Sequence, residues 1–152
     1  ICRFRSLWVT EGKRKDVFWR SAMSGGRATM GRKRGESIRQ SGDITAVAEE
    51  GHILTNSRYI ECRFYKDMAL AAFFIKKEGT LAGHWRQVRR EAASHEKTPW
   101  LIAKQNMWPI LLITDTPYLT RMHSLLCPTK VWVDDDYCYV FQLDDVLRGS
   151  ID

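Results

Sequence analysis

The sequence predicts an α/β domain with a mixed β-sheet flanked by helices, because apolar segments of strand type alternate with helical patterns. Strand-type segments lie at 43–48 and 59–64, a helical pattern follows at 81–94, and two further strand-type segments lie at 100–103 and 110–114. The composition, 44% hydrophobic and 28% charged, is ordinary for a globular protein. The 152 residues are enough to bury one core.

The first part of the chain predicts a helix followed by loops. Residues 1–10 carry apolar side chains at helical spacing, and we expect the beginning of this helix to lie upstream of Ile1. A charged turn at 11–16 and a short apolar anchor at 17–20 follow. Residues 21–35, with several glycines and basic residues, predict a basic loop.

The strand at 43–48 is expected to lead through a hairpin-like turn at 49–51 into 52–54, with the second strand at 59–64. A short apolar helix is expected at 66–75. Thr80 is a candidate cap for the helix at 81–94.

Strands are also expected at 130–133 and 137–143, separated by an acidic turn at 134–136. We expect one domain over 1–152, with 115–152 as a C-terminal extension of the sheet. This extension holds seven acidic residues against three basic ones, so it is a poor surface for a polyanion and is expected to face away from one or to join a second subunit.

The charge is concentrated near the N-terminus, where residues 1–42 hold eleven Lys and Arg against three Asp and Glu. This imbalance indicates a surface that faces a polyanion. No apolar stretch is long enough to cross a membrane. The four cysteines and four histidines form no closely spaced ligand pair, so a structural zinc site is not expected.

Asp43, Glu61 and Arg63 form the pattern that carries chemistry. Metal-assisted phosphodiester hydrolysis needs carboxylates that hold a hard cation, together with a basic group beside them. Alternate residues of a strand share a face, so Glu61 and Arg63 are expected on one face and Cys62 on the other. If the strands at 43–48 and 59–64 pair as a hairpin, Asp43 and Glu61 meet at one edge. The alternative is structural, an internal ion pair of Glu61 with Arg63 or Lys66.

Four blocks of sequence carry a resemblance to phage and prophage nucleases of the PD-(D/E)xK type that are described as Holliday junction resolvases. The likeness extends from about 7 to 114, and the blocks are 16–21 (DVFWRS), 24–29 (SGGRAT), 40–44 (QSGDI) and 60–63 (IECR). It implies a restriction-endonuclease-like core that cleaves duplex or branched DNA as a homodimer in the cytoplasm of a bacterial host cell.

The resemblance also implies that Asp43 and Glu61 bind Mg²⁺ or Mn²⁺, and that position 63 is the place of the catalytic lysine. This chain has Arg63 there, and arginine cannot lose its proton near neutral pH. Lys66 is a candidate replacement. Such nucleases often have a further acid on the first helix, for which Glu36 is the nearest candidate.

Basic residues around these positions are candidate phosphate contacts. The glycine-hinged loop directly before Asp43 is expected to reach DNA, and the helix at 81–94 and the residues after 103 add further cations. The candidates are Arg27, Arg32, Lys33, Arg34, Arg39, Arg86, Arg90 and Lys104.

The leading hypothesis is therefore a Mg²⁺-dependent DNA endonuclease. The alternatives are a catalytically weakened nuclease fold that serves as a DNA-binding or recombination-accessory protein, and a protein-interaction domain that uses its aromatic and acidic C-terminal part.

Overall fold

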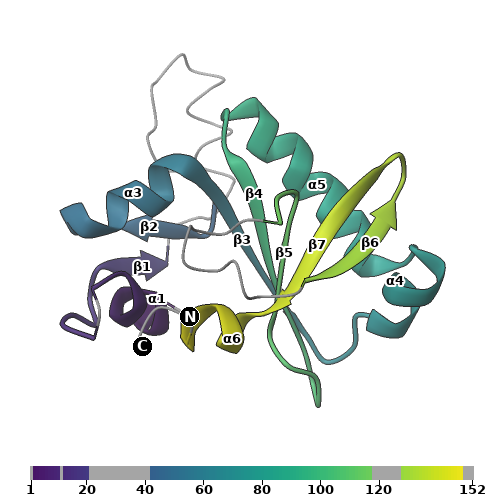
Figure 1. Cartoon of the computed structure of the whole chain (residues 1–152), viewed down its shortest axis with the longest axis horizontal. Coiled ribbons are helices and arrows are strands. Elements are labelled where there is room, and N and C mark those ends of the chain that lie inside the picture. Colours follow the sequence, from purple (N-terminus) through teal and green to yellow (C-terminus); the bar gives the residue numbers. More distant parts are fainter. Residues whose placement is uncertain (1, 11, 21–41, 118–127, 149–152) are drawn as a thin grey trace.

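A five-stranded mixed sheet forms the centre of the computed structural model, which describes residues 2–10, 12–20, 42–117 and 128–148 (Figure 1). Its first pair is parallel and the other pairs are antiparallel. In spatial order the strands are β3 (Arg58–Tyr65), β4 (Thr98–Gln105), β5 (Leu111–Thr114), β7 (Asp136–Gln142) and β6 (Thr129–Val133). A parallel pair needs a crossover connection, and here it is helical.

The crossover helices α4 (Leu70–Lys76) and α5 (Thr80–Ser94) cover one face of the sheet. The apolar stripe of α5 includes Trp85, which is 1% exposed, and it packs against Leu101 of β4 and Ile113 of β5. Because strand residues alternate between faces, the odd-numbered residues of β3 point to the α5 side and the even-numbered ones to the opposite side.

The opposite face is covered by the two-stranded sheet of β1 (Phe18–Arg20) and β2 (Ile44–Ala46), together with short helices. The helices are α1 (Cys2–Val9), α3 (Glu49–Ser57) and α6 (Leu143–Arg148). Val17, Phe18 and Ile44 pack there against Ile60 and Ile102. Helices therefore flank a mixed sheet on both sides, which confirms the predicted fold class.

The expected hairpin-like turn at 49–51 is wrong, because these residues begin α3. Glu49 and Glu50 lie in its first turn, where the helix dipole favours negative charge. Gly51 is buried against β1 and β2, and a β-carbon there would lie 2.7 Å from Val17. β2 is also shorter than the strand expected at 43–48, and it pairs with β1 rather than with β3.

Two further expectations need correction. The helix expected at 66–75 begins only at Leu70, because Ala69 directly before it is left-handed with φ +52°, and the Gln105 side-chain oxygen accepts the backbone N–H of Met68 at 2.7 Å. Thr80 does not cap α5, since Gly79 precedes the helix and no side chain bonds to that end. None of the helices in the described ranges is long and apolar enough to span a membrane.

Candidate metal and nucleic-acid site

Asp43 lies against the edge of β3 that β4 does not occupy. Its backbone N–H donates to the Ile60 carbonyl at 2.7 Å, and its Oδ2 accepts the backbone N–H of Cys62 at 2.8 Å. Gly42 makes this approach possible, because its φ is +84° and a β-carbon there would lie 2.5 Å from the Ile60 oxygen. The expected hairpin of the two strands is therefore wrong, and Asp43 meets β3 through its own backbone and carboxylate.

Glu61 and Arg63 share the face of β3 that points toward α5, as the alternation of strand residues predicts. Glu61 is only 6% exposed, and its Oε1 is 2.6 Å from Nη2 of Arg63. The ion pair that was the structural alternative is therefore present. This ion pair gives Oε1 of Glu61 a partner but does not account for Oε2.

Three buried polar atoms of this cluster have no hydrogen-bond partner among the described residues. They are Oδ1 of Asp43, Oε2 of Glu61 and Nε of Arg63. A buried polar atom without a partner costs free energy, and most such atoms in folded proteins are satisfied. The two carboxylate oxygens are therefore the strongest indication that the cluster accommodates a ligand.

Asp43 is near enough to Glu61 for its negative charge to affect the pKa of that side chain. Burial raises the pKa of Glu61 from 4.5 to about 7, and the negative charge of Asp43 is the next largest cause. Arg63 acts in the opposite direction and lowers it. Near neutral pH the protonated and ionised forms of Glu61 are therefore similar in free energy, and a nearby cation would favour the ionised form.

A third carboxylate, that of Glu91 on α5, lies on the same side of β3. The Tyr59 hydroxyl donates a hydrogen bond to it, and the Gln87 amide donates another at 3.0 Å. Its charge also raises the pKa of Glu61. Glu91 is thus held beside the candidate site by two donors. Glu91 was not among the residues predicted from the sequence.

His84 lies on the same flank of α5, with its ring stacked on Tyr65 at 5.6 Å between centroids. Its Nε2 is buried and has no hydrogen-bond partner in the described part of the chain. Burial, and then the charge of Arg63, lower its pKa, which favours the neutral imidazole. His84, Gln87 and Glu91 follow helical spacing, and that spacing was the only signal in the sequence that could have grouped them.

On the other side of β3, Asp43 and Cys62 line a pocket of about 250 Å³ with Arg20. The pairing of Arg20 with Ile44 places this arginine next to the residue that follows Asp43. An exposed cation beside the pocket is a suitable contact for a phosphate. Arg20 was not among the sequence candidates, because its proximity depends on the pairing of β1 with β2.

In the part of the chain that the structure describes, no ion pair joins the remaining candidates to Asp43 or Glu61. Lys66 is exposed just beyond the end of β3. Lys104 is on β4 opposite Phe64, and its ammonium donates to the Trp108 carbonyl. The loop candidates Arg27, Arg32, Lys33, Arg34 and Arg39, and Glu36, lie outside the described residues.

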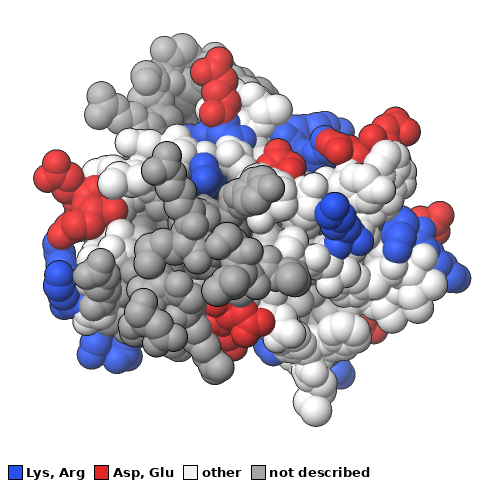
Figure 2. All heavy atoms as spheres, in the orientation of Figure 1, with Lys and Arg blue, Asp and Glu red and all other residues white. Residues whose placement is uncertain are grey.

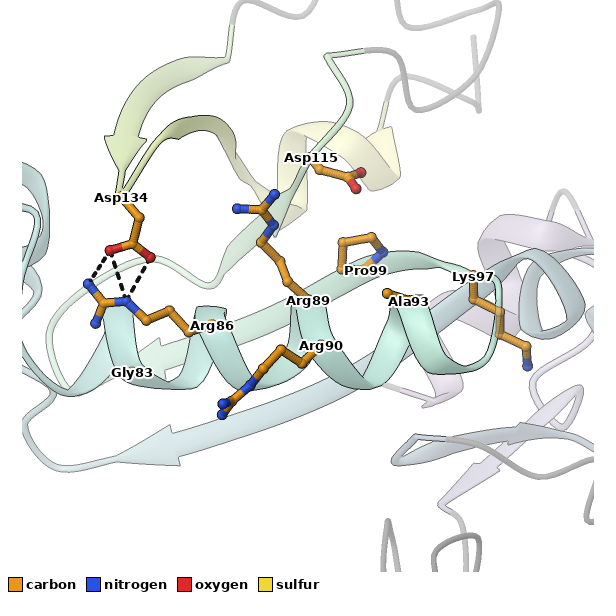
Figure 3. Close-up of a pocket in the computed structure, with 9 residues that line it drawn as sticks. All are labelled: Gly83, Arg86, Arg89, Arg90, Ala93, Lys97, Pro99, Asp115 and Asp134. Atoms are coloured by element: carbon orange, nitrogen blue, oxygen red, sulfur yellow. Dashed lines mark hydrogen bonds and ion pairs between the residues drawn. The ribbon is translucent and has the colours of Figure 1, made fainter. Parts of the chain in front are cut away.

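Arg86 and Arg90 are on α5, away from the flank that faces Glu61. Arg86 forms an ion pair with Asp134, and Figure 3 shows Arg90 pointing away from that pair. In the view of Figure 2, Lys and Arg on the described surface are interspersed with Asp and Glu. Asp134 belongs to the C-terminal extension that was expected to face away from DNA, and it contacts one of the predicted DNA-binding residues.

The donor set fits a hard divalent cation. Asp43 and Glu61 each offer a buried oxygen without a partner, and Mg²⁺ is usually held by one or two carboxylates with water and substrate phosphate completing its shell. No group of three or more His, Cys, Asp or Glu residues suited to a metal occurs within the described ranges. Asp43 and Glu61 would therefore supply only part of the coordination shell of a cation, and water and a substrate phosphate would supply the rest.

Comparison with known proteins identifies the family. Residues 9–131 match the family model described as "Phage putative PDDEXK endonuclease", and this span includes Asp43, Glu61 and Arg63. No curated protein and no solved structure matches significantly. The mixed sheet flanked by helices is a restriction-endonuclease-like fold, in agreement with this match. The chain belongs to the phage PD-(D/E)xK endonuclease family.

Proposed function

We propose that the protein is an endodeoxyribonuclease that hydrolyses phosphodiester bonds with Mg²⁺ or Mn²⁺ held by Asp43 and Glu61. The observation that carries the proposal is the pair of buried, unpartnered carboxylate oxygens at the edge of β3. Ion pairing with Arg63 accounts for only one Glu61 oxygen. A divalent cation would satisfy the remaining oxygens and compensate the repulsion between the two carboxylates.

The roles of the side chains follow from their chemistry. A bound divalent cation supplies electrophilic assistance to phosphodiester hydrolysis. Asp43 is fixed by the Cys62 N–H, so one of its oxygens is oriented while the other is left for the ligand. Arg63 stabilises negative charge on the phosphate, since a guanidinium offers several donors and only one of its nitrogens contacts Glu61. Lys66 is a second cation that could reach the phosphate.

The test is cleavage of supercoiled plasmid by the wild-type protein with Mg²⁺, with Mn²⁺ or with EDTA. Metal-dependent nicking is expected, and Asp43→Asn and Glu61→Gln should each abolish it while leaving DNA affinity similar. Glu96→Gln, which changes an exposed carboxylate remote from this cluster, is the matched control. Nicking that persists in EDTA, or in both carboxylate variants, would contradict the proposal.

We further propose that branched DNA is the preferred substrate and that a homodimer cleaves it, because symmetric cuts in a junction need two sites. The resemblance in the four sequence blocks supports this finer assignment. A synthetic four-way junction should be cleaved faster than a linear duplex of the same arms. Light scattering should give twice the monomer mass. Equal rates on both substrates would argue for duplex cleavage.

One observation favours a second candidate, a DNA-binding protein whose nuclease site is weakened. Arg63 occupies the position of the catalytic lysine and is paired with Glu61, so it competes with a cation for that carboxylate. Such a protein would bind junctions and duplexes in a salt-dependent way without nicking them in any metal. The plasmid assay combined with a binding assay therefore separates the two candidates.

A further inference from the structure

A groove of about 690 Å³ runs along the side of α5 that faces the β6–β7 turn (Figure 3). Cations outnumber anions among the charged residues of its wall. These residues are Arg86, Arg89, Arg90, Lys97, Asp115 and Asp134. The groove is distinct from the Asp43–Glu61 cluster, because it lies across α5 from the flank that carries Gln87 and Glu91.

Two of the arginines are occupied by the acidic turn. Arg86 donates from Nε and Nη2 to both oxygens of Asp134, at 2.8 to 3.1 Å, and Figure 3 shows this two-pronged contact. Arg89 donates to Asp136 at 3.1 Å. A carboxylate held this way uses the same planar fork of donors that binds a phosphate. The turn therefore occupies the donors that a phosphate would use.

These ion pairs are exposed, which makes them easy to exchange. The side chains of Arg86 and Asp134 are 43% and 47% exposed, and those of Arg89 and Asp136 are 36% and 58% exposed. Exposed pairs contribute little to stability because water screens them. A phosphate can therefore replace either carboxylate without disturbing the apolar core beneath α5.

We infer that this groove binds the phosphate backbone of a nucleic acid, and that Asp134 and Asp136 compete with it for Arg86 and Arg89. The inference rests on the proposed function only in taking DNA as the ligand. Arg90 extends the surface, since it lines the same groove, points away from the Arg86–Asp134 pair in Figure 3 and makes no ion pair with a described residue. Lys97 lies at the far end, where its ammonium donates to the Thr55 carbonyl at 2.6 Å.

Competition between the acidic turn and a phosphate for the same arginines gives a reason for aspartates beside a groove that four cations line. Removing one acid should free its arginine, whereas removing a neighbouring acid that holds no arginine should only change the net charge. Asp135 provides that comparison, because it is exposed in the same turn and no ion pair joins it to the described residues. The pair Asp134→Asn and Asp135→Asn therefore separates competition at Arg86 from a general charge effect.

The experiment measures fluorescence anisotropy of a labelled duplex in EDTA, so that cleavage does not interfere, over a series of salt concentrations. Asp134→Asn should tighten binding about threefold to fivefold more than Asp135→Asn does. Arg86→Ala should weaken binding and reduce the slope of log affinity against log salt by about 1. In the double variant Arg86→Ala with Asp134→Asn, the gain should disappear.

Equal effects of Asp134→Asn and Asp135→Asn would overturn the inference, as would an Arg86→Ala variant with unchanged affinity and salt slope, or no DNA binding by any form. Thermal unfolding confirms that each variant is folded. Glu61→Gln keeps the two proposals distinct, because the loss of metal-dependent nicking in that variant concerns only the Asp43–Glu61 site. If the wild type does not nick DNA but Asp134→Asn still tightens DNA binding more than Asp135→Asn does, the nuclease proposal is refuted and the inference about the groove stands.

Discussion

Replacing Glu61 by glutamine should stabilise the metal-free protein at neutral and alkaline pH. The side chain is buried and one oxygen has no partner among the described residues. Its negative charge therefore lowers the stability of the folded protein. Glutamine has nearly the same shape and carries no charge. The substitution therefore removes the cost of ionisation while changing the packing little.

The size of the effect follows from the pKa of Glu61, which folding raises from 4.5 to about 7. A raised pKa means that the folded protein holds this proton more tightly than the unfolded chain does. The wild type therefore loses stability as pH rises from 4.5 through 7, and the loss is complete above 7. At 1.36 kcal/mol per pKa unit the full loss is about 3 kcal/mol. Glu61→Gln should be nearly neutral at pH 4.5 and stabilising by about that amount at pH 8.

Urea unfolding in EDTA, followed by tryptophan fluorescence from pH 4.5 to pH 8, measures this difference. Trp85 and Trp100 are buried and report loss of the core. Glu96→Gln, which changes an exposed carboxylate, is the matched control. Adding Mg²⁺ should stabilise the wild type and leave the glutamine variant unchanged, because only the wild type retains the ligand. A Glu61→Gln variant that is less stable than the wild type at pH 8, or whose difference does not change with pH, would refute the reasoning.

Substitutions at three other positions test the same cluster. Arg63→Lys should raise the rate of plasmid nicking by about tenfold or more, because lysine can give up a proton and arginine cannot; an unchanged rate would assign the role to another cation. Asp43→Asn should abolish nicking with little change in urea midpoint, since the amide oxygen can still accept the Cys62 N–H, whereas Asp43→Ala should cost about 1–2 kcal/mol. Gly42→Ala should destabilise the protein by about 1–3 kcal/mol and reduce nicking, because the residue has φ +84° and its β-carbon would strike Ile60; wild-type stability and activity there would contradict the close approach.

The elements predicted correctly are those whose apolar pattern decides their structure locally. β3, α5, β4 and β5 were expected at nearly their observed positions, because each buries a continuous or periodic apolar face. The segment that forms α3 was misassigned because Glu-Glu-Gly is compatible with a turn as well as with the acidic first turn of a helix. Contact of Gly51 with β1 and β2 decides between them, and that contact is not visible in the sequence.

In the candidate site, too, some residues could be predicted from the sequence and others depend on contacts between distant parts of the chain. Asp43, Glu61 and Arg63 could be proposed from spacing, since an acid followed by Glu-x-basic is a pattern along the chain. Glu91 could not, because its contact with Tyr59 joins residues 32 positions apart through the packing of α5 on β3. The Arg86–Asp134 pair, separated by 48 positions, likewise depends on the turn of β6 and β7 lying over α5.

The choice between an active nuclease and a weakened descendant depends on what the two unpartnered oxygens are for. If Arg63 had become a purely structural partner, the simplest stable arrangement would pair or remove both carboxylates, because a buried unpaired oxygen lowers stability without any compensation. Asp43 and Glu61 instead keep one such oxygen each, and the negative charge of Asp43 helps to raise the pKa of Glu61. Stability that is lost in the metal-free protein and recovered on binding a cation is what a functional site produces. The two unpartnered oxygens, and not the pairing with Arg63, are therefore the reason to propose a site that exchanges Arg63 for a cation rather than one that has lost its ligand.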